Sequence, residues 1–569
     1  MLKKIREYLF NQFAIDTRAI TPFRVTLAVV LIFDLLMRIP EVGSFYADNG
    51  VLPRYIELSN PINYLRFSVH YIFGSISGQL IIFVVHILLA FLFAIGFRLR
   101  WVTPILWVFT SSLHVRNYLV LQSGDTALRL FIFWSMFLPI FGELSFDGIS
   151  GKTKEIGKKI FTIGIFGMLS QVAIIYFFAG YEKSYETYFS KGDALLYAMN
   201  LERYATDFGI SLQAFPELLK LMSRITYAAE ILCPILLFIP FKNWIFRTIM
   251  LVTFVLFHIG TVMMMEVGFF PFISMTMWVI LLPSQFFDLL KNKKALVKYR
   301  YLINYSGNNF WKKTALILSY IVDAKLEFQP SQSTSYKIDD TNVSKEDFIN
   351  EISRHSIFYS RLTAKVIRKL LTFIFSFDDL NIVSTLKLNI IGKKTWMLVG
   401  VLFVTYNILL NLKPYNFTSN SIKMFLDKIE SIDVLKHGFN FEQRWGMFSP
   451  YPSKSDGWHV IYGERFNGSK VDLWGTDFRN PMKKPESVAD TYRNQRWRKY
   501  LDTVIRESHK GYRPYFLQHI CYEINKGKKN PMQKLKKVYH RYIEELTLEG
   551  GKGVAPLKEI DFGSVTCIK

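Results

Sequence analysis

The sequence has few cysteines, and their spacing excludes the usual cysteine-based metal sites. Its 569 residues include only Cys233, Cys521 and Cys567, which form no metal-spaced cluster. Zinc and iron–sulfur sites need several closely spaced thiolates, so no metal site is predicted. Cys233 lies in an apolar run and is expected to pack there. Cys521 and Cys567 could form a disulfide if their segment faces an oxidising compartment, or could remain isolated thiols.

Charged residues are also scarce for a chain of this length. Only 20% of the residues are charged and 50% are hydrophobic, and the mean hydropathy is +0.19. A soluble protein of this size would be more polar, so the composition indicates a membrane protein with membrane lipid as a partner. The net charge of +23 does not by itself indicate nucleic acid, because the basic residues lie largely between and beside apolar runs. No nucleic-acid motif is present, so nucleic acid is not expected as a partner.

About nine apolar runs are candidates for crossing a bilayer. A helix needs roughly 20 apolar residues to span the hydrocarbon core, and only helices satisfy the backbone of such single segments in lipid. The first run is followed by no small-residue cleavage site, so it is expected to act as an uncleaved signal anchor. The expected fold class is an all-α polytopic membrane protein with about nine transmembrane helices and a small α+β extracytoplasmic C-terminal domain. The runs lie near residues 21–39, 78–97, 101–118, 128–141, 160–178, 226–239, 244–264, 269–282 and 395–412.

The basic residues that flank these runs all fall on one side if the runs alternate in direction. The positive-inside rule assigns that side to the cytoplasm. The N-terminus is then cytoplasmic and the C-terminal domain is extracytoplasmic, with the protein in the cytoplasmic (inner) membrane. The flanking residues are Lys3, Lys4, Arg6, Arg98, Arg100, Lys152, Lys154, Lys158, Lys159, Lys242, Arg247, Lys291, Lys293, Lys294, Lys298 and Arg300.

Four parts are expected along the chain. They are a transmembrane domain at 1–285, a cytoplasmic insertion at 286–394, a final transmembrane helix at 395–412 and an extracytoplasmic domain at 413–569.

Local patterns predict elements within the last three parts. The polar stretch 329–344 indicates a disordered link, and 358–377 an amphipathic helix on the membrane surface. Alternating residues around Asn467-Gly468 predict a β-hairpin, and 488–507 and 534–549 are expected to be helices.

Lys183 ends an apolar run that starts near Ile160. An ammonium deep in hydrocarbon costs about 2.5–3.5 kcal/mol on insertion scales, and loss of its proton removes that cost. A neutral amine in a membrane pocket is a base, so Lys183 is a candidate for proton abstraction. The alternative is that Lys183 only extends to the membrane interface.

Further polar side chains lie inside apolar runs or at their outer ends. Glu230 and His258 are within runs, and Arg116, Asn117 and Asp125 are at outer ends. An interhelical ion pair would explain Glu230, as it would Arg24, Asp34 and Arg38, and a hydrogen-bonded core position would explain His258.

The common depth of the residues at outer ends instead favours a polar pocket roofed by the outer loops and the C-terminal domain. We expect Lys183 to face a cavity that Arg116, Asn117 or Asp125 also lines. Gly180, three residues before Lys183, would leave room for a ligand ring.

An ordered pattern of residues resembles the HTTM (horizontally transferred transmembrane) domain family, which includes the vitamin K-dependent γ-carboxylases. The resemblance covers roughly residues 15–285, and the segment Gln-Arg-Trp-Gly-Met-Phe-Ser-Pro at 443–450 resembles the extracytoplasmic tail of bacterial members. The pattern consists of Phe23-Arg24, Asp34, Arg38, Phe45-Tyr46, Asp48, Gly50, Pro53, Arg116-Asn117, Gly124-Asp125, Phe177, Gly180, Lys183, Gly192, Ala194, Glu230, Pro234 and His258.

The resemblance implies an enzyme that couples hydroquinone oxidation to carboxylation. Lys183 would deprotonate reduced vitamin K or another hydroquinone, with O2 and CO2 as co-substrates and a secreted peptide or protein as the acceptor. Asp125, the second expected catalytic residue, and Arg116 would help orient or polarise the quinol oxygens. The expected cofactor-binding residues are Arg116, Asn117, Gly180, Glu230 and His258.

Two departures from the carboxylases leave another function open. The carboxylases carry a histidine in a stretch where this chain reads Ser123-Gly124-Asp125-Thr126, and the C-terminal module is too small to match the propeptide-binding region of the animal enzymes. Peptide carboxylation could therefore be lost. The alternative is a non-enzymatic membrane protein for export, immunity or lipid binding.

Overall fold

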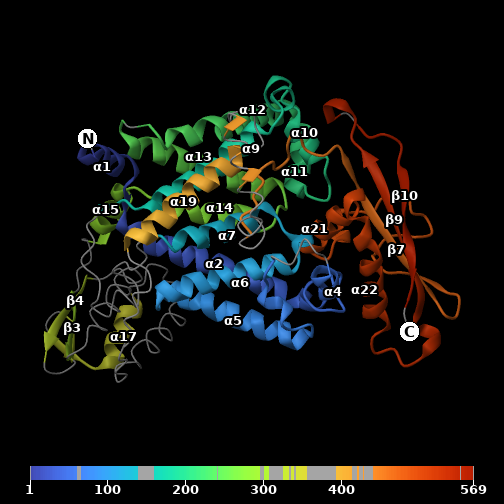
Figure 1. Cartoon of the computed structure of the whole chain (residues 1–569), viewed down its shortest axis with the longest axis horizontal. Coiled ribbons are helices and arrows are strands. Elements are labelled where there is room, and N and C mark those ends of the chain that lie inside the picture. The colour runs from blue at the N-terminus through green and yellow to red at the C-terminus, as the bar shows by residue number, and fades with distance from the viewer. Residues whose placement is uncertain are drawn as a thin grey trace.

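The computed structural model describes most of the chain, with helices in the first half and a sheet domain at the C-terminus (Figure 1). It describes residues 2–59, 66–138, 159–239, 241–294, 300–306, 325–331, 335–338, 341–354, 393–412, 440–551 and 553–567, and positions 420, 421, 424, 427 and 428.

Each predicted apolar run lies on a helix. The largest difference in a boundary is α12, which starts at Pro216 rather than near residue 226, because proline is well suited to the first turn of a helix. The helices are α2 (Ile20–Arg38), α5 (Ile76–Ile95), α6 (Leu99–Arg116), α7 (Ser123–Ser135), α9 (Ile163–Tyr181), α12 (Pro216–Leu236), α13 (Asn243–Met264), α14 (Phe270–Val279) and α19 (Lys393–Leu412). Shorter helices are α1 (Leu2–Phe13), α3 (Val42–Phe45), α4 (Arg54–Leu58), α10 (Ala194–Met199), α11 (Asp207–Ser211) and α15 (Ser284–Lys294), and β1 (Ile15–Asp16) pairs with β2 (Lys159–Ile160).

Four helical segments in the described part are long and apolar enough to cross a membrane. They are Thr17–Phe45, Ile76–Ile95, Ile163–Tyr181 and Asn243–Met264, and the shorter apolar helices Phe270–Val279 and Met397–Leu412 accompany them. The protein is therefore a helical membrane protein, and a total of nine spans stays a prediction.

Helix α9 is the most enclosed of these four segments. Of its apolar window 83% is buried, against 22% for α13, and it packs against α7, α12 and α19. A Cβ atom at Gly167 of α9 would lie 2.4 Å from the ring of Trp134, so glycine is required where α9 meets α7. Because α9 is central, the residues at its C-terminal end are held in a fixed place.

The insertion contains a small sheet with strand order β4-β3-β5-β6. Strands β3 (Arg300–Ser306) and β4 (Lys325–Ser331) are parallel, and β5 (Ser335–Ile338) and β6 (Thr341–Val343) complete the sheet before α17 (Lys345–Arg354). The stretch 329–344, expected as a disordered link, therefore contributes to three strands, because its Tyr336 is buried against Phe348 of α17. The amphipathic helix predicted at 358–377 lies outside the described residues.

The C-terminal domain is an antiparallel sheet, order β10-β9-β7-β8, with helix α22 packed against β9 and β10. Its elements are β7 (Ser455–Arg465), β8 (Lys470–Asp472), α21 (Gln495–Val504), α22 (Arg513–Asn525), β9 (Leu535–Leu546) and β10 (Lys558–Thr566). The β7–β8 hairpin confirms the prediction, with Gly468 at φ 81° in its turn. The helix predicted at 488–507 is shorter, at Gln495–Val504, and the helix predicted at 534–549 is wrong. That segment is strand β9, because it pairs with β7 on one side and β10 on the other.

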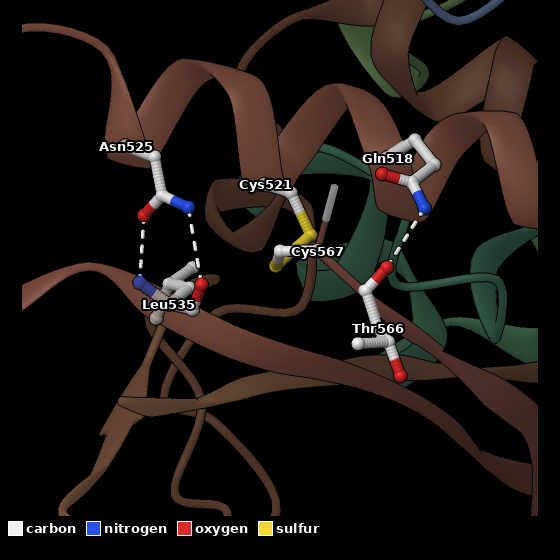
Figure 2. Close-up of a disulfide and its surroundings, with 6 residues drawn as sticks. All are labelled: Gln518, Cys521, Asn525, Leu535, Thr566 and Cys567. Atoms are coloured by element: carbon white, nitrogen blue, oxygen red, sulfur yellow. Dashed lines mark hydrogen bonds between the residues drawn. A yellow bond between two sulfur atoms is a disulfide. The ribbon is translucent and has the colours of Figure 1, made fainter. Parts of the chain in front are cut away.

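A disulfide joins α22 to the end of the sheet (Figure 2). The Cα atoms of Cys521 and Cys567 are 5.5 Å apart, which confirms the predicted pair. Asn525 accepts from the backbone N–H of Leu535 at 2.6 Å and donates to its carbonyl at 3.1 Å, and Gln518 donates to the carbonyl of Thr566 at 2.9 Å. One face of α22 is thus fastened to both β9 and β10.

Candidate functional site

A cavity of about 1080 Å³ lies where the helical bundle meets the C-terminal domain. Its walls come from the end of α9 with the following loop, from α12 and α13, from the segment 444–455, and from α21. The side chains include both apolar residues of the helices and polar residues of the C-terminal domain, so the cavity has an apolar and a polar half. The predicted roof from the C-terminal module is present.

Lys183 lies two residues after the end of α9 and lines this cavity. Its side chain is only 5% exposed, and its Nζ donates to the Glu230 carboxylate and, at 3.2 Å, to the carbonyl of Ala179. The ring centroid of Tyr188 is 5.4 Å from Nζ. The predicted pairing of Glu230 across helices is thus present, and its partner is Lys183. An extended snorkelling side chain at the bilayer surface does not fit this burial.

Gly180 has a packing role that differs from the predicted one. A Cβ atom there would lie 2.9 Å from both Cβ of Glu230 and Cγ1 of Ile231. The glycine therefore lets α9 and α12 approach each other and brings Lys183 to Glu230. It does not leave space for a ligand ring, so the predicted role of Gly180 in binding a cofactor is wrong.

His258 reaches the cavity only through Tyr176. The Tyr176 hydroxyl lies 2.6 Å from Nε2 of His258, which is fully buried in α13. Tyr176 itself lines the cavity, and its ring stacks on Phe254 with centroids 3.7 Å apart. Sequence reasoning missed Tyr176, although it stands seven residues before Lys183, a spacing that places two helical residues on the same side.

Asp125 does not lie beside Lys183. It belongs to a buried ion cluster with Arg38, Arg496 and Asp34, in which Arg38 Nη2 is 2.6 Å from Asp125 Oδ1 and Arg496 Nη2 is 2.7 Å from Asp34 Oδ1. Arg38 also donates from Nε to Asp34 Oδ2 at 2.8 Å. The predicted catalytic role of Asp125 conflicts with this placement, because both of its oxygens are already paired.

Arg116 and Asn117 are also committed to other groups. Arg116 donates to the carbonyls of Leu52 at 2.8 Å and Ala47 at 3.3 Å, and Asn117 donates to the carbonyl of Phe45 at 2.9 Å. None of Arg116, Asn117 and Asp125 is among the described residues that line the cavity. The expectation that one of them shares the cavity with Lys183 is wrong, because Arg116 and Asn117 bind the backbone of residues 45–52 and Asp125 is held by Arg38 and Arg496.

The segment 443–450 covers the cavity close to Lys183. The backbone N–H of Ser184 donates to the carbonyl of Pro450 at 2.7 Å, and the Tyr188 hydroxyl donates to the carbonyl of Phe448 at 2.9 Å. Gln443 accepts from Gln171 of α9 at 2.9 Å. The same segment that resembles the bacterial tail is therefore tied at one end to the middle of α9 and at the other to the residues after α9.

The polar half of the cavity is built around Arg203. Arg203 lies 3.4 Å from Asp456 and 3.5 Å from Asp502, and Tyr204 donates to Asp502. Burial raises the pKa of Asp456 to about 6, although the positive charge of Arg203 acts to lower this pKa. Burial also lowers the pKa of Lys499, which lines the same half. In the described part of the chain, no group of three or more His, Cys, Asp or Glu side chains could hold a metal ion.

Comparison with known proteins identifies the helical half of the chain. The HTTM domain matches residues 14–286, which carry Tyr176, Lys183, Glu230 and His258. No curated protein and no solved structure matches the chain. The resemblance expected from the ordered residue pattern is confirmed over nearly the same range. Residues 14–286 match the HTTM domain family, and this match together with the apolar helices indicates a membrane protein.

Proposed function

We propose that the protein is a membrane enzyme that uses a hydroquinone, with Lys183 as the base, in the manner of the vitamin K-dependent γ-carboxylases. The observation that carries this proposal is the buried Lys183–Glu230 pair at the wall of a large cavity next to the Tyr176–His258 pair. Buried titratable groups that converge on a cavity are characteristic of active sites.

The residues present suit an aromatic ring that carries hydroxyl groups. Tyr176, Tyr188, Phe257 and Phe270 offer ring faces and edges, and Lys183 and the Tyr176 hydroxyl offer polar partners. Reduced vitamin K or another hydroquinone, when bound, would supply the oxidisable group, with O2 and CO2 as co-substrates.

Lys183 can accept a proton only as the neutral amine. The segment 443–450 covers the site on one side, and the Glu230 carboxylate lies within hydrogen-bonding distance of the Lys183 amine. Glu230 then holds the ammonium that forms when Lys183 takes up a proton. If Nε2 of His258 carries the proton and donates it to the Tyr176 hydroxyl, Tyr176 is free to donate a hydrogen bond to a substrate oxygen.

The C-terminal disulfide supports the orientation expected from the basic loops. Disulfides persist in oxidising compartments, so the pair Cys521–Cys567 favours an extracytoplasmic C-terminal domain. The sheet of the insertion and the C-terminal domain also lie at opposite ends of the bundle (Figure 1). A bacterial inner membrane with a secreted peptide or protein as acceptor fits this arrangement. Reporter fusions after Lys298 and after Pro450 should report opposite sides of the membrane.

The test is quinol oxidation by the purified full-length chain in nanodiscs. Reduced vitamin K and menaquinol are incubated with O2 and bicarbonate, and the quinone products are separated by chromatography. Lys183→Met should abolish turnover, and so should Lys183→Arg, because a guanidinium does not deprotonate. Lys191→Met, an exposed lysine near the same site, should keep turnover. Absence of quinol binding by the wild type, or turnover by Lys183→Met, would refute the proposal.

A second candidate is a non-enzymatic lipid-binding or export protein. The observation that favours it is that the Lys183 amine is already satisfied by Glu230 and Ala179. In that case the pair only joins α9 to α12. Lys183→Met/Glu230→Leu would then be stable and keep any lipid binding.

A further inference from the structure

Three cations of the cavity have no role in the proposed function. Arg444, Lys499 and Arg506 all line it, from the segment 444–455 and from α21 and the residues after it. Among the described residues, no carboxylate forms an ion pair with any of these three side chains. The neighbouring arginines differ, because Arg203 faces two carboxylates and Arg498 donates to the carbonyl of Arg203 at 2.6 Å. Asp502 offsets part of the charge of Lys499, but the described lining holds six basic and two acidic side chains, and this excess of positive charge attracts an anion.

The apolar half of the same cavity reaches the lipid-facing surface between α12 and α13. Ile225 of α12 and Leu256 of α13 line the cavity and are nevertheless 55% and 62% exposed. A side chain that lines a cavity and is also largely exposed marks an opening. Gly260 of α13 lines the cavity too, and a Cβ atom there would meet no other atom within 4 Å. An open passage therefore runs past Gly260, on a helix whose surface is mostly uncovered by protein.

We propose that this cavity binds an anionic amphiphile that enters sideways from the bilayer. The anionic group, a phosphate or a carboxylate, lies against Arg444, Lys499 and Arg506, and the apolar chain passes Gly260 between α12 and α13. At about 1080 Å³ the cavity is at the upper end of the range for small-molecule sites, so a chain-bearing ligand fits. The anionic group is held by residues other than Lys183 and Glu230, which line the same cavity, so the inference goes beyond the proposed function.

Binding of a fluorescent phosphatidylglycerol to the purified full-length chain tests the charge requirement. The wild type should bind it at least tenfold more tightly than the phosphatidylcholine analogue. The triple variant Arg444→Gln/Lys499→Gln/Arg506→Gln should lose this preference. The matched control Lys483→Gln/Lys529→Gln/Lys558→Gln removes equal charge from exposed positions that do not line the cavity, and it should keep the preference. The proposal is overturned if the wild type binds both lipids equally, or if only the control variant loses the preference for phosphatidylglycerol.

Gly260→Leu tests the lateral entrance, and competition with inorganic phosphate tests the source of the anion. Gly260→Leu should weaken lipid binding at least tenfold without lowering the melting temperature, and Val262→Leu, on the same helix but outside the described lining, should not. Inorganic phosphate should compete only weakly, because it lacks the chain. Full displacement by phosphate together with normal binding by Gly260→Leu would identify a soluble anion as the ligand and overturn the proposal.

Discussion

Arg496 of α21 and Asp125 of α7 are 371 residues apart in sequence and form a two-point ion pair. Nη1 of Arg496 lies 2.6 Å from Oδ2 of Asp125, and Nη2 lies 2.9 Å from Oδ1. The same guanidinium also reaches Asp34 of α2. One side chain of the C-terminal domain therefore pairs with two carboxylates of the HTTM domain, which it neutralises together with Arg38, and it ties the domain that covers the cavity to the bundle.

Loss of this arginine should destabilise the protein strongly. Arg496→Gln leaves Asp34 and Asp125 buried with Arg38 as their remaining arginine, and removing one partner of a buried pair costs about 3–5 kcal/mol. The melting temperature of the detergent-solubilised protein should fall by at least about 5 °C. Arg493→Gln, an exposed arginine that contacts ring faces of Trp474 and Trp497, should lower it by far less. Equal effects of the two changes would contradict this role.

Gly180→Leu should separate α9 from α12 and break the Lys183–Glu230 pair. The new side chain would overlap Glu230 and Ile231, and overpacking of this kind costs about 1–3 kcal/mol. Both the melting temperature and any quinol turnover should fall. Gly260→Ala is the control for the melting temperature alone, because a Cβ atom there meets open space, and alanine favours a helix over glycine by about 1 kcal/mol. A stable, active Gly180→Leu variant would contradict the packing role.

Uniform apolar runs predicted the helices well because lipid leaves a single segment no other way to satisfy its backbone. Strand β9 was missed because its Lys- and Glu-rich sequence lacks a clear local signal, and its pairing with β7 and β10 depends on residues far along the chain. The alternation of buried and half-buried residues from Val538 to Tyr542 was the available signal.

The site was predicted in part for a similar reason. Lys183 and Glu230 were recognisable as charges at or within apolar runs. The placement of Asp125 could not be predicted, because its partner Arg496 belongs to another domain. A single sequence does not show which distant residues are in contact. Tyr176 was hidden among the many aromatic residues of the lipid-exposed helices.

Removal of the disulfide should weaken the C-terminal domain. The bond closes a separation of 46 residues, for which the chain-entropy account gives about 4 kcal/mol. The double variant Cys521→Ala/Cys567→Ala should therefore have a lower melting temperature than the wild type. Under reducing conditions the melting temperature of the wild type should fall towards that of the double variant. Cys233→Ala, which removes a half-buried free thiol, should not show this sensitivity. The wild type is also labelled with a maleimide in intact cells. If both Cys521 and Cys567 react as free thiols, a location of the C-terminal domain in an oxidising compartment is excluded.

Acidification should destabilise the C-terminal domain through a buried histidine pair. Nδ1 of His459 and Nε2 of His540 lie 2.9 Å apart, and both side chains are fully buried. Burial lowers the pKa of His459 to about 3, and it lowers the pKa of His540 well below its usual value. The unfolded chain, with a histidine pKa near 6.5, binds protons first, so stability is complete above about pH 6.5 and falls as the pH drops below it.

At pH 5 the free energy of unfolding should be lower by up to about 2 kcal/mol for each histidine. This value follows from about 1.4 kcal/mol per pH unit between pH 6.5 and pH 5. Asp456 acts in the opposite direction, because its raised pKa of about 6 lets the folded state take up a proton before the unfolded one does. The comparison is therefore made between the wild type and His540→Gln, which keeps a hydrogen-bonding group beside His459 and leaves Asp456 unchanged. Thermal melts at pH 7.5 and pH 5 should show a smaller drop for His540→Gln than for the wild type. Identical drops would show that this pair does not set the acid sensitivity of the domain.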